Sequence, residues 1–570
     1  MKYNSYESYQ AKGIALVRFP MLDETVIEDL AKCDGKQLTE RIKKYIEDPR
    51  VREAIYLASP ELFNRMKEWE GDSDKFNNLH ISIARYLLRM SFRATPFGAF
   101  SCIGSCEIFG EKTSISFPAK GEIRRSIGLD TSVLANIVFL ARRNPKIRNE
   151  LILEINDTLY VKNGLAYFIA FHRNRKGKRI YKNVEVEWSH ELALLVDIVH
   201  KGMKFSDVVA KMQSAIPGEF SLESVEEYIL SLIESDILTC DALIDITSDN
   251  VFGNMLSQFP VGSEFVTQLK CIEGKINAFN SNPFDDNASY LKIVEDLTQA
   301  GIHPPRSGSF KVDLVTDDIA GCLGNDVVSK LHQTLNKLVI YKPRINQLNN
   351  FKRLYFERYG ESEIPLLTII NELEAYGYTD LLTHSPALSR YVFGGVNKEN
   401  GKSKGGWPES VLSYVLQQQE QLYVDVSVLL QDFSSNILHS SKPRDIVTWI
   451  SLWEEKDVLD GEPIIEIKSI GAQHPGRIMG RFASSLPAVK NFLSEYDGND
   501  NALIVEIVHL PEDRIGNICG RPKLSEYEIR IRSGGSSSSN SISVDDLMVS
   551  VINNRVLLRS RKLNRYLSIR

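Results

Sequence analysis

Three arginines recur at every fourth position in the segment RYLLRMSFRATPFGAFSCIG, residues 85 to 104. On a helix Arg85, Arg89 and Arg93 would form one row, because residues four apart lie on the same face. No Asp or Glu occurs between Lys75 and Cys106 to pair with them. Guanidinium groups bind phosphates and carboxylates through paired, charge-assisted hydrogen bonds. The row therefore predicts a helix face that binds an anion.

A second interpretation is that carboxylates from distant parts of the chain pair with these arginines in the fold. The same segment predicts a second, apolar face, made by Leu79, Ile83, Tyr86 and Met90. It lies roughly 100° from the arginine row, which would place the arginines at the border of the buried side. Thr95 is expected to end the helix because it precedes Pro96, and its hydroxyl would stand beside the same anion.

Composition narrows the class of protein. The 570 residues are 43% hydrophobic and 25% charged, with a net charge of −6, as in ordinary globular proteins of two to four domains. The N-terminus lacks the pattern of a signal peptide, and no apolar run reaches a membrane-spanning length of about 18 residues. We therefore expect a cytoplasmic protein, either free or peripheral to a membrane-associated biosynthetic complex.

The cysteine and histidine spacings argue against disulfide and metal chemistry. The seven cysteines contain no C-x-x-C pair, and the ten histidines contain no H-E-x-x-H motif. Cys102 and Cys106 are better explained as small buried side chains than as zinc ligands. The loop at 394 to 409 approaches a phosphate-binding motif before Gly401-Lys402-Ser403, but the required upstream glycine is Val396. No metal or nucleotide cofactor is predicted.

The elements that must position the arginines alternate between helical and strand patterns, so the predicted class is α+β. A strand is expected within residues 13 to 22, helices up to Arg93, and strands from Phe100 onward. Residues 156 to 245 resemble a winged helix-turn-helix, with two strands around a basic turn and three amphipathic helices after them. The predicted division is 1 to 155, 156 to 245 and 246 to 570.

The winged-helix segment is not expected to read DNA, because its third helix, LESVEEYILSLIESD, is acidic. We predict that it offers a strand edge to a peptide, and a purely structural role is the alternative. Two basic runs, 173 to 182 and 555 to 570, each hold six Lys or Arg. Each is either a solvated surface or a local site for a polyanion.

Eight segments, in order along nearly the whole chain, resemble the class I lantibiotic dehydratases of the nisin dehydratase group. RYLLRMSFRATPFGAFS resembles the family's R-x-x-x-R-x-T-P-[FY]-G segment. The other seven are ALVRFP, RRSIGLD, FKVDLV, FKRLYFERYGESEIPLL, GRIMGRFA, LPEDRIGNICGRP and VDDLMVSVINNRVLLRSRKL.

This resemblance implies a multi-lobed glutamylation domain with an inserted winged helix that binds a leader peptide. It also implies transfer of glutamate from glutamyl-tRNA to Ser or Thr of a precursor peptide, the first step of dehydration. The implied catalytic residues are Arg18, Arg89, Arg93, Thr95, Asp130, Asp313 and Arg481, with Arg477 one turn from the last. Either Asp130 or Asp313 could orient an arginine or accept the hydroxyl proton.

In the family these segments are followed by the rest of the glutamylation domain and by an elimination domain, whereas this sequence stops at Arg570. We therefore expect an aminoacyl-tRNA-dependent transferase whose elimination step needs another polypeptide. The expected partners are the precursor peptide, glutamyl-tRNA, an elimination protein and a cyclase, with a homodimer as a further option. A non-catalytic leader-binding subunit and a peptide-aminoacyl-tRNA ligase are the alternative functions.

Overall fold

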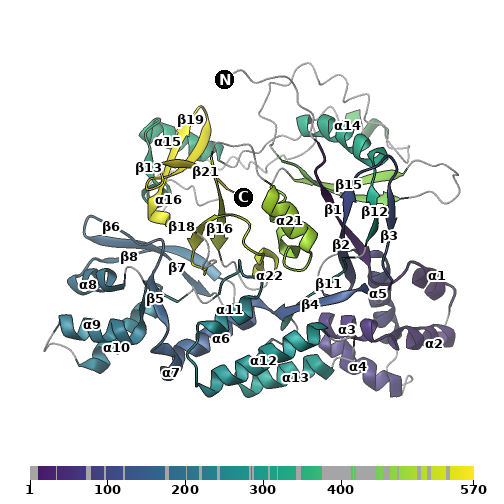
Figure 1. The fold of residues 1–570 in the computed structure, drawn as a ribbon, viewed down its shortest axis with the longest axis horizontal. Helices are drawn as coiled ribbons and strands as arrows, with labels where there is room; N and C mark the ends of the chain where they lie inside the picture. The colour runs from purple at the N-terminus through teal and green to yellow at the C-terminus, as the bar shows by residue number, and fades with distance from the viewer. Residues whose placement is uncertain are drawn as a thin grey trace.

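The description of the fold rests on a computed structural model. It describes residues 10–33, 35–71, 79–94, 98–119, 122–173, 179–199, 202–216, 221–240, 244–281, 284, 288–305, 308–317, 319–341, 348–374, 413–414, 416–418, 445–453, 463–471, 474–496, 502–509, 515–534 and 540–569. Thr95 and the loop at 394 to 409 lie outside these residues. Figure 1 shows α1 to α5 at one end of the molecule and α8 to α10 at the other, with α12 and α13 between them.

A helical bundle follows the first strand, β1 (Ile14–Pro20). Its members are α1 (Thr25–Ala31), α2 (Gly35–Ile46), α3 (Pro49–Ala58), α4 (Pro60–Gly71) and α5 (Leu79–Phe92). The start of α3 is fixed by Pro49 and by Asp48, whose side chain accepts a hydrogen bond from the Arg50 N–H. α5 packs against α1 and α2, which holds the arginine-bearing helix against the bundle.

The central sheet joins strands that are far apart in the sequence. Within the described residues it has six strands, in the order β3 (Ser114–Ser116), β12 (Ala320–Leu323), β2 (Ser101–Ile108), β11 (Phe310–Val315) and β4 (Arg124–Leu129), with β1 paired to β2. β11 runs parallel to β2 and antiparallel to β4. The register places Arg18 opposite Ile103, and Ile103 opposite Val315.

One face of this sheet carries the polar residues of interest. Successive side chains on a strand point to opposite faces, so Lys311 and Asp313 share the face of Val315. That face is covered by α20 (Gly476–Met479), the 3₁₀ turn η5 (Gly480–Phe482) and α21 (Pro487–Glu495), which pack on it through an apolar cluster. The cluster contains Ile103, Val315, Met479, Phe482, Leu486 and Val489.

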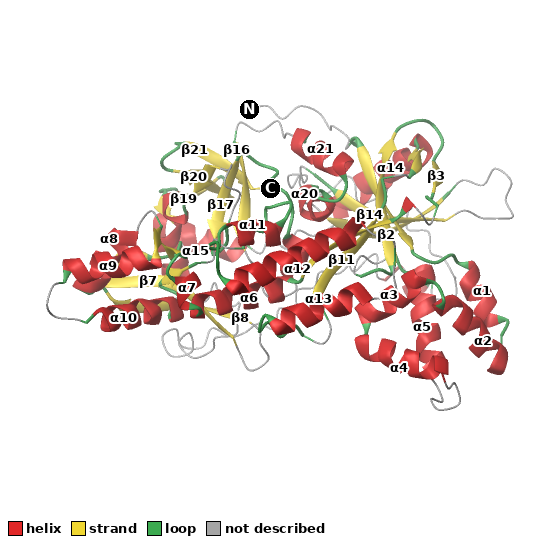
Figure 2. Cartoon of the chain, turned by 60° about the horizontal axis from the view of Figure 1, so that its bottom comes forward, coloured by secondary structure: helices red, strands yellow, loops and turns green. Residues whose placement is uncertain are grey.

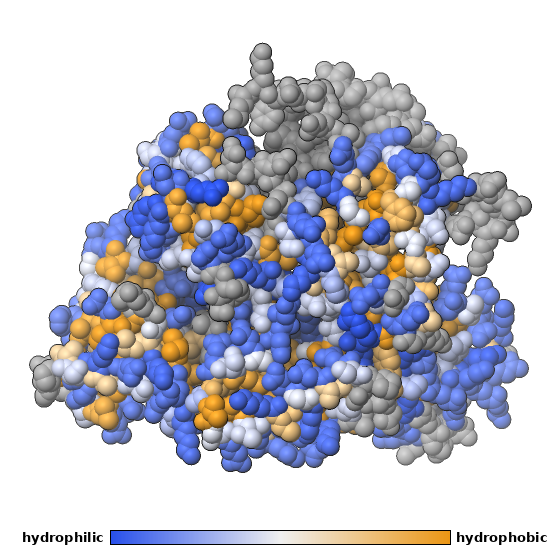
Figure 3. Space-filling view, in the orientation of Figure 1, coloured by the Kyte–Doolittle hydropathy of each residue, from blue (hydrophilic) through white to orange (hydrophobic). Residues whose placement is uncertain are grey.

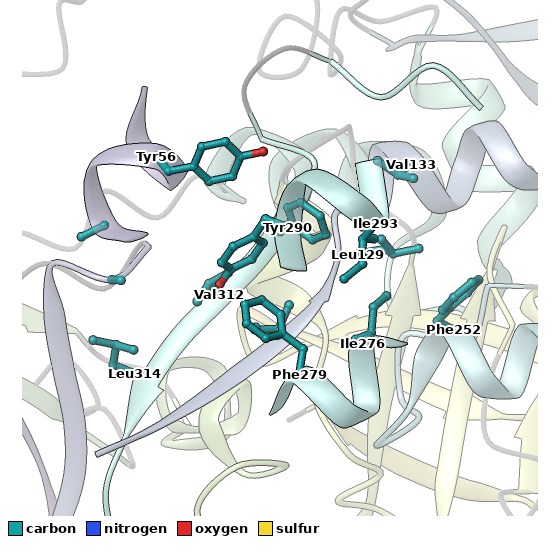
Figure 4. Packing of buried hydrophobic residues seen from close by; sticks show 14 of the residues in the cluster. Tyr56, Leu129, Val133, Phe252, Ile276, Phe279, Tyr290, Ile293, Val312 and Leu314 are labelled. Carbon is teal, nitrogen blue, oxygen red and sulfur yellow. The ribbon is translucent and has the colours of Figure 1, made fainter. Parts of the chain in front are cut away.

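The opposite face of the sheet packs against helices that precede β11 in the sequence. α11 (Val251–Ser257), α12 (Glu264–Ser281) and α13 (Ala288–Gln299) lead back to β11 (Figure 2). Helix α12 contacts β4. Aromatic rings fill this interface, with Tyr290 between Tyr56 and Phe279 (Figure 4). The Glu53 carboxylate accepts hydrogen bonds from Arg125 at 2.7 Å and from the Tyr290 hydroxyl at 2.8 Å.

The predicted winged-helix segment builds an apolar cluster of its own, centred on Phe168, Leu195, Phe205 and Ile229. α6 (Thr131–Arg143) and α7 (Pro145–Arg148) precede it. Its strands are β6 (Tyr160–Lys162), β7 (Leu165–Arg173), β8 (Arg179–Glu187), β9 (Met203–Lys204) and β10 (Leu238–Thr239); its helices are α8 (His190–Val199), α9 (Phe205–Ala215) and α10 (Leu222–Glu234). Strand β5 (Ile152–Ile155) ends just before residue 156 and pairs with β9 and β10. Strands β6, β7 and β8 form a three-stranded antiparallel sheet, in which β8 is an edge.

The C-terminal part forms a second large sheet. Its order is β13 (Ile364–Pro365), β19 (Leu547–Ile552), β20 (Arg555–Ser560), β21 (Arg565–Ile569), β16 (Leu503–His509), β17 (Tyr527–Ile531) and β18 (Asn540–Ile542). The remaining elements are α14 (Asn325–Tyr341), α15 (Asn349–Tyr359), α16 (Leu366–Glu374), the hairpin of β14 (Val447–Trp453) and β15 (Ile464–Gly471), α22 (Gly516–Cys519) and η7 (Val544–Asp546). An ion pair of 2.9 Å between Arg532 and Asp236 joins this sheet to the winged-helix segment.

The α+β class is confirmed by these sheets and helices, while the division into three segments stays a prediction. Cys102 and Cys106 are buried on β2, and burial raises the pKa of Cys102 to about 12. On the face shown in Figure 3, hydrophobic residues lie in several patches separated by hydrophilic ones. Among the described residues, no helix is long and apolar enough to cross a membrane.

Candidate active site

A buried ion pair lies at the centre of the polar sheet face. The Arg481 Nη2 donates to Asp313 Oδ1 at 2.5 Å, and the two side chains are 5% and 7% exposed. Arg481 is in η5 and Asp313 is on β11, so the pair fastens the covering helices to the sheet. Arg477, the other arginine of this segment, is exposed. The geometry therefore places Arg481, and not Arg477, against Asp313.

Arg18 stands behind this pair on β1. Its guanidinium carbon lies 4.1 Å from the ring centroid of Trp449 and 5.4 Å from that of Phe482. Burial and the charge of Arg481 lower the pKa of Arg18 and the charge of Asp313 raises it, with a net pKa of about 10. The buried Nη1 has no hydrogen-bond partner among the described residues. Arg18 remains charged at neutral pH and adds positive potential to this face.

A cavity of about 530 Å³ opens beside the ion pair. Its polar walls come from α5, β11, η5 and α22, which contribute Arg89, Lys311, Arg481 and Asn517. Apolar and small residues complete it, including Tyr56, Gly98, Phe100 and Val312. Elements from four distant parts of the sequence therefore present three cationic side chains and one amide to the same space.

The arginine row of α5 contributes one member to this cavity. Arg85, Arg89 and Arg93 are all exposed, and no ion pair to any of them is found within the described residues. The row was predicted to border the buried side, and this was wrong: Leu87, rather than Tyr86, completes the buried stripe, which turns the arginines further toward solvent. Arg89 lines the cavity, with its guanidinium 5.7 Å from the Phe100 ring centroid.

Lys311 is a site residue that the sequence interpretation missed. Burial lowers its pKa, as does the charge of Arg481, while Asp313 raises it. Its cross-strand neighbour on β4 is Gly128, and a Cβ atom at that glycine would meet nothing within 4 Å. Open space therefore lies beside Gly128, the strand neighbour of Lys311. The signal was available, because strand alternation in FKVDLV places Lys311 and Asp313 on one face.

Asp130 has a different role from Asp313. It is fully buried and caps α6, with Oδ1 accepting from the N–H and the hydroxyl of Ser132. Its Oδ2 accepts from Asn517 Nδ2 at 2.7 Å, and Asn517 Oδ1 accepts from the Thr131 N–H at 3.0 Å. The Asp130 carboxylate therefore contacts Asn517, which lines the cavity. Sequence reasoning included Asn517 in a family segment but gave it no role.

The structure thus brings together five of the seven predicted residues: Arg18, Asp313 and Arg481 in one cluster, Arg89 across the cavity, and Asp130 behind Asn517. Arg93 lies exposed just beyond the end of α5 and is not among the lining residues. Thr95 cannot be placed, because it is outside the described residues. In the part of the chain that the structure describes, no cluster of three or more His, Cys, Asp or Glu could hold a metal ion.

The comparison with known families decides where this chain belongs. Residues 47–570 match the family model described as "Lantibiotic dehydratase, N terminus". The chain belongs to the lantibiotic dehydratase family. Among curated members, it is 20% identical to the subtilin biosynthesis protein SpaB of Bacillus subtilis, over 95% of this chain and 53% of SpaB. It is 21% identical to the nisin biosynthesis protein NisB of Lactococcus lactis subsp. lactis, over 63% of this chain and 36% of NisB.

Solved structures of lantibiotic dehydratases and related proteins share the fold. The tRNA-dependent lantibiotic dehydratase MibB from Microbispora sp. 107891 superposes with a TM-score of 0.78 at 16% identity, covering 99% of this chain and 55% of MibB. The glutamylation domain of TbtB, from thiomuracin biosynthesis, superposes with a TM-score of 0.67 at 15% identity, covering 94% of this chain and 67% of that domain. The chain spans about half the length of SpaB and MibB.

Proposed function

We propose that this chain transfers the glutamyl group of glutamyl-tRNA to Ser or Thr hydroxyls of a ribosomally made precursor peptide. The hydroxyl oxygen attacks the ester carbonyl carbon, and the bond from that carbon to the tRNA ribose oxygen breaks. The hydroxyl proton ends on the ribose oxygen. This acyl transfer needs no metal or nucleotide cofactor, and glutamyl-tRNA acts as co-substrate.

The observation that carries this proposal is the cavity in which Arg89, Arg481 and Lys311 meet. The tRNA end brings phosphates and the glutamyl side chain brings a carboxylate, and both suit guanidinium and ammonium donors. Arg89 has no ion pair among the described residues, so it is available to such an anion. Asp313 fixes the direction of Arg481, and Arg18 keeps the neighbouring space positive.

Membership of the lantibiotic dehydratase family supports the reaction class. Two structural relatives support it as well: MibB is a tRNA-dependent lantibiotic dehydratase, and the TbtB structures are glutamylation domains. One TbtB structure is bound to 5'-phosphodesmethylglutamycin. Arg93 and Thr95, which belong to the same family segment as Arg89, are proposed to take part in the same transfer.

We also propose that the winged-helix segment binds the precursor peptide. Strand β8 pairs with β7 on one side, and its other edge has no strand partner among the described residues. An extended peptide could add to this edge by main-chain hydrogen bonds. A separate elimination protein and a cyclase are the proposed partners for the later steps.

The test is mass spectrometry of the precursor peptide encoded beside the gene. Glutamyl-tRNA is first made from glutamate, tRNA, ATP and glutamyl-tRNA synthetase, and the peptide is then incubated with the chain and this glutamyl-tRNA without ATP. Peptide heavier by one or more glutamyl residues on Ser or Thr would support the proposal. Addition at the peptide C-terminus that requires fresh ATP would favour a peptide-aminoacyl-tRNA ligase instead.

A matched pair of variants separates an enzyme from a leader-binding subunit. Arg89→Ala removes the cation that lines the cavity, whereas Arg85→Ala removes an arginine one turn earlier that does not line it. Loss of glutamylation in the first variant alone supports catalysis in the cavity. Equal glutamylation in both variants would remove Arg89 from the proposed catalytic residues.

A further inference from the structure

The short helix α22 is locked onto the start of α6 by two neighbouring residues. Gly516 lies against Thr131, where an added Cβ would come within 2.7 Å of the Thr131 side chain. The next residue, Asn517, accepts from the Thr131 N–H and donates to the Asp130 carboxylate. The absence of a side chain at Gly516 is therefore what lets Asn517 reach both partners.

These two hydrogen bonds fix the orientation of the Asn517 amide. A backbone N–H can only donate and an ionised carboxylate can only accept, so Oδ1 must face Thr131 and Nδ2 must face Asp130. The amide nitrogen carries two hydrogens, and Asp130 takes one of them. The second hydrogen has no acceptor among the described residues, although the side chain is 3% exposed and lines the cavity.

Asn517 differs from the other donors of the cavity because it is neutral. Arg89, Arg481 and Lys311 carry groups suited to phosphate or carboxylate. A rigid neutral N–H is better suited to a carbonyl oxygen, which becomes negative only when a hydroxyl has added to the carbonyl carbon. The negative charge of Asp130 holds this donor in place without lying in the cavity itself.

We propose that Asn517 is a catalytic hydrogen-bond donor to the ester carbonyl oxygen of the glutamyl group, and that Asp130 is the positioning residue that orients it. This inference rests on the proposed glutamyl transfer. It assigns Asp130 neither to the proton of the peptide hydroxyl nor to an arginine. The donor strengthens its bond as the carbonyl oxygen gains charge, so it accelerates acyl transfer more than it tightens binding.

The test compares single-turnover glutamylation by the full chain with binding of a stable glutamyl-adenosine analogue, in which an amide replaces the ester. Asn517→Ala is expected to slow transfer about 100-fold, as loss of one oxyanion donor does in other acyl-transfer sites. Binding of the analogue should change less than about 3-fold, because the lost interaction belongs to the transition state. A loss of analogue binding equal to the loss of rate would overturn the assignment.

Asp130→Asn tests the positioning role. It keeps an oxygen to cap α6 but places an amide against the Asn517 amide, which favours rotation of Asn517 away from its productive orientation. We expect this variant to transfer glutamate about 10-fold more slowly or worse. The double variant, Asp130→Asn with Asn517→Ala, should be no slower than Asn517→Ala alone, because the two residues act as a unit. Multiplying losses in the double variant would show that Asp130 does not act through Asn517.

The matched control is Asn280→Ala. The Asn280 side chain is also held by two hydrogen bonds, to the N–H and the carbonyl of Ile127 on β4, but it does not line the cavity. It should leave the rate within about 3-fold of wild type. If the wild-type chain is active and Asn517→Ala is as fast as this control, the inference about Asn517 is overturned but the proposed function is not. Absence of transfer by the wild-type chain would instead overturn the proposed function, and this inference with it.

Discussion

Arg481 donates a hydrogen bond of 2.5 Å to Asp313 across the boundary between η5 and β11, and both side chains are more than nine-tenths buried. The pair connects the helices that cover the sheet with the strand that carries Lys311 into the cavity. Its charges are therefore held away from water and close to the space where an anionic substrate is proposed to bind. Structure and function depend on the same contact, and suitable variants can separate them.

Asp313→Ala should destabilise the chain strongly, because it leaves the Arg481 guanidinium buried without its carboxylate. The expected cost is about 3 to 5 kcal/mol, as measured when one partner of a buried ion pair is removed. Replacing both residues by apolar ones, Asp313→Leu with Arg481→Met, should recover much of this stability but none of the glutamylation. Melting temperatures and transfer rates of both variants check this. A double variant as unstable as Asp313→Ala would contradict the account.

Arg89→Ala should reduce the rate of glutamyl transfer by about 10- to 100-fold, because a charge-assisted hydrogen bond contributes about 1.5 to 3 kcal/mol. Its melting temperature should match that of wild type, since Arg89 is exposed and makes no ion pair among the described residues. Arg89→Lys keeps the charge without the planar fork, and should retain part of the rate. A variant with normal activity and lowered stability would make Arg89 a structural residue.

How far the sequence could predict this site depends on the range of each interaction. Local spacing predicts the arginine row on α5, the strand that carries Arg18, and which residues of β11 share a face. All three elements are present. Which carboxylate meets Arg481 is decided by the packing of η5 on a strand 168 positions earlier, which no local pattern encodes. The link from Asp130 to Asn517 spans 387 positions and was missed for the same reason.

The exposure of the arginine row shows a different limit. The periodicity of apolar residues fixed which side of α5 is buried but not how wide that side is. The structure buries Leu79, Ile83, Leu87 and Met90, and α1 and α2 contact the helix. Arg89 lies outside this set, where it is exposed and lines the cavity.

Lys311→Met should raise the melting temperature at about pH 7, because the fold disfavours the charged lysine. Burial lowers the pKa of Lys311 from its ordinary value of 10.5, so the folded chain binds the proton less tightly than the unfolded chain. The destabilising contribution is fully present below the folded pKa and fades as the pH rises from there toward 10.5. The difference between variant and wild type should shrink over that window, while glutamylation should fall at every pH.

Melting temperatures measured across this range check the prediction for Lys311. Lys36→Met is the control, because Lys36 is exposed on α2 and should give the same melting temperature as wild type. A lower melting temperature for Lys311→Met at about pH 7 would show that the lysine contributes favourably to the fold. A difference that stays constant with pH would show that the difference in stability does not come from the charge of the lysine.

The buried network of Glu53, Arg125 and Tyr290 should support the cavity wall. Glu53 precedes the stretch of α3 that lines the cavity, and its carboxylate binds both Arg125 at 2.7 Å and the Tyr290 hydroxyl at 2.8 Å. Tyr290→Phe removes one neutral donor and should cost about 1 kcal/mol. Glu53→Gln removes the charge that faces a guanidinium enclosed by aromatic rings, and should cost about 3 to 5 kcal/mol. Denaturant titrations would give both values, and equal losses would mean that the charge of Glu53 contributes nothing beyond its hydrogen bonds.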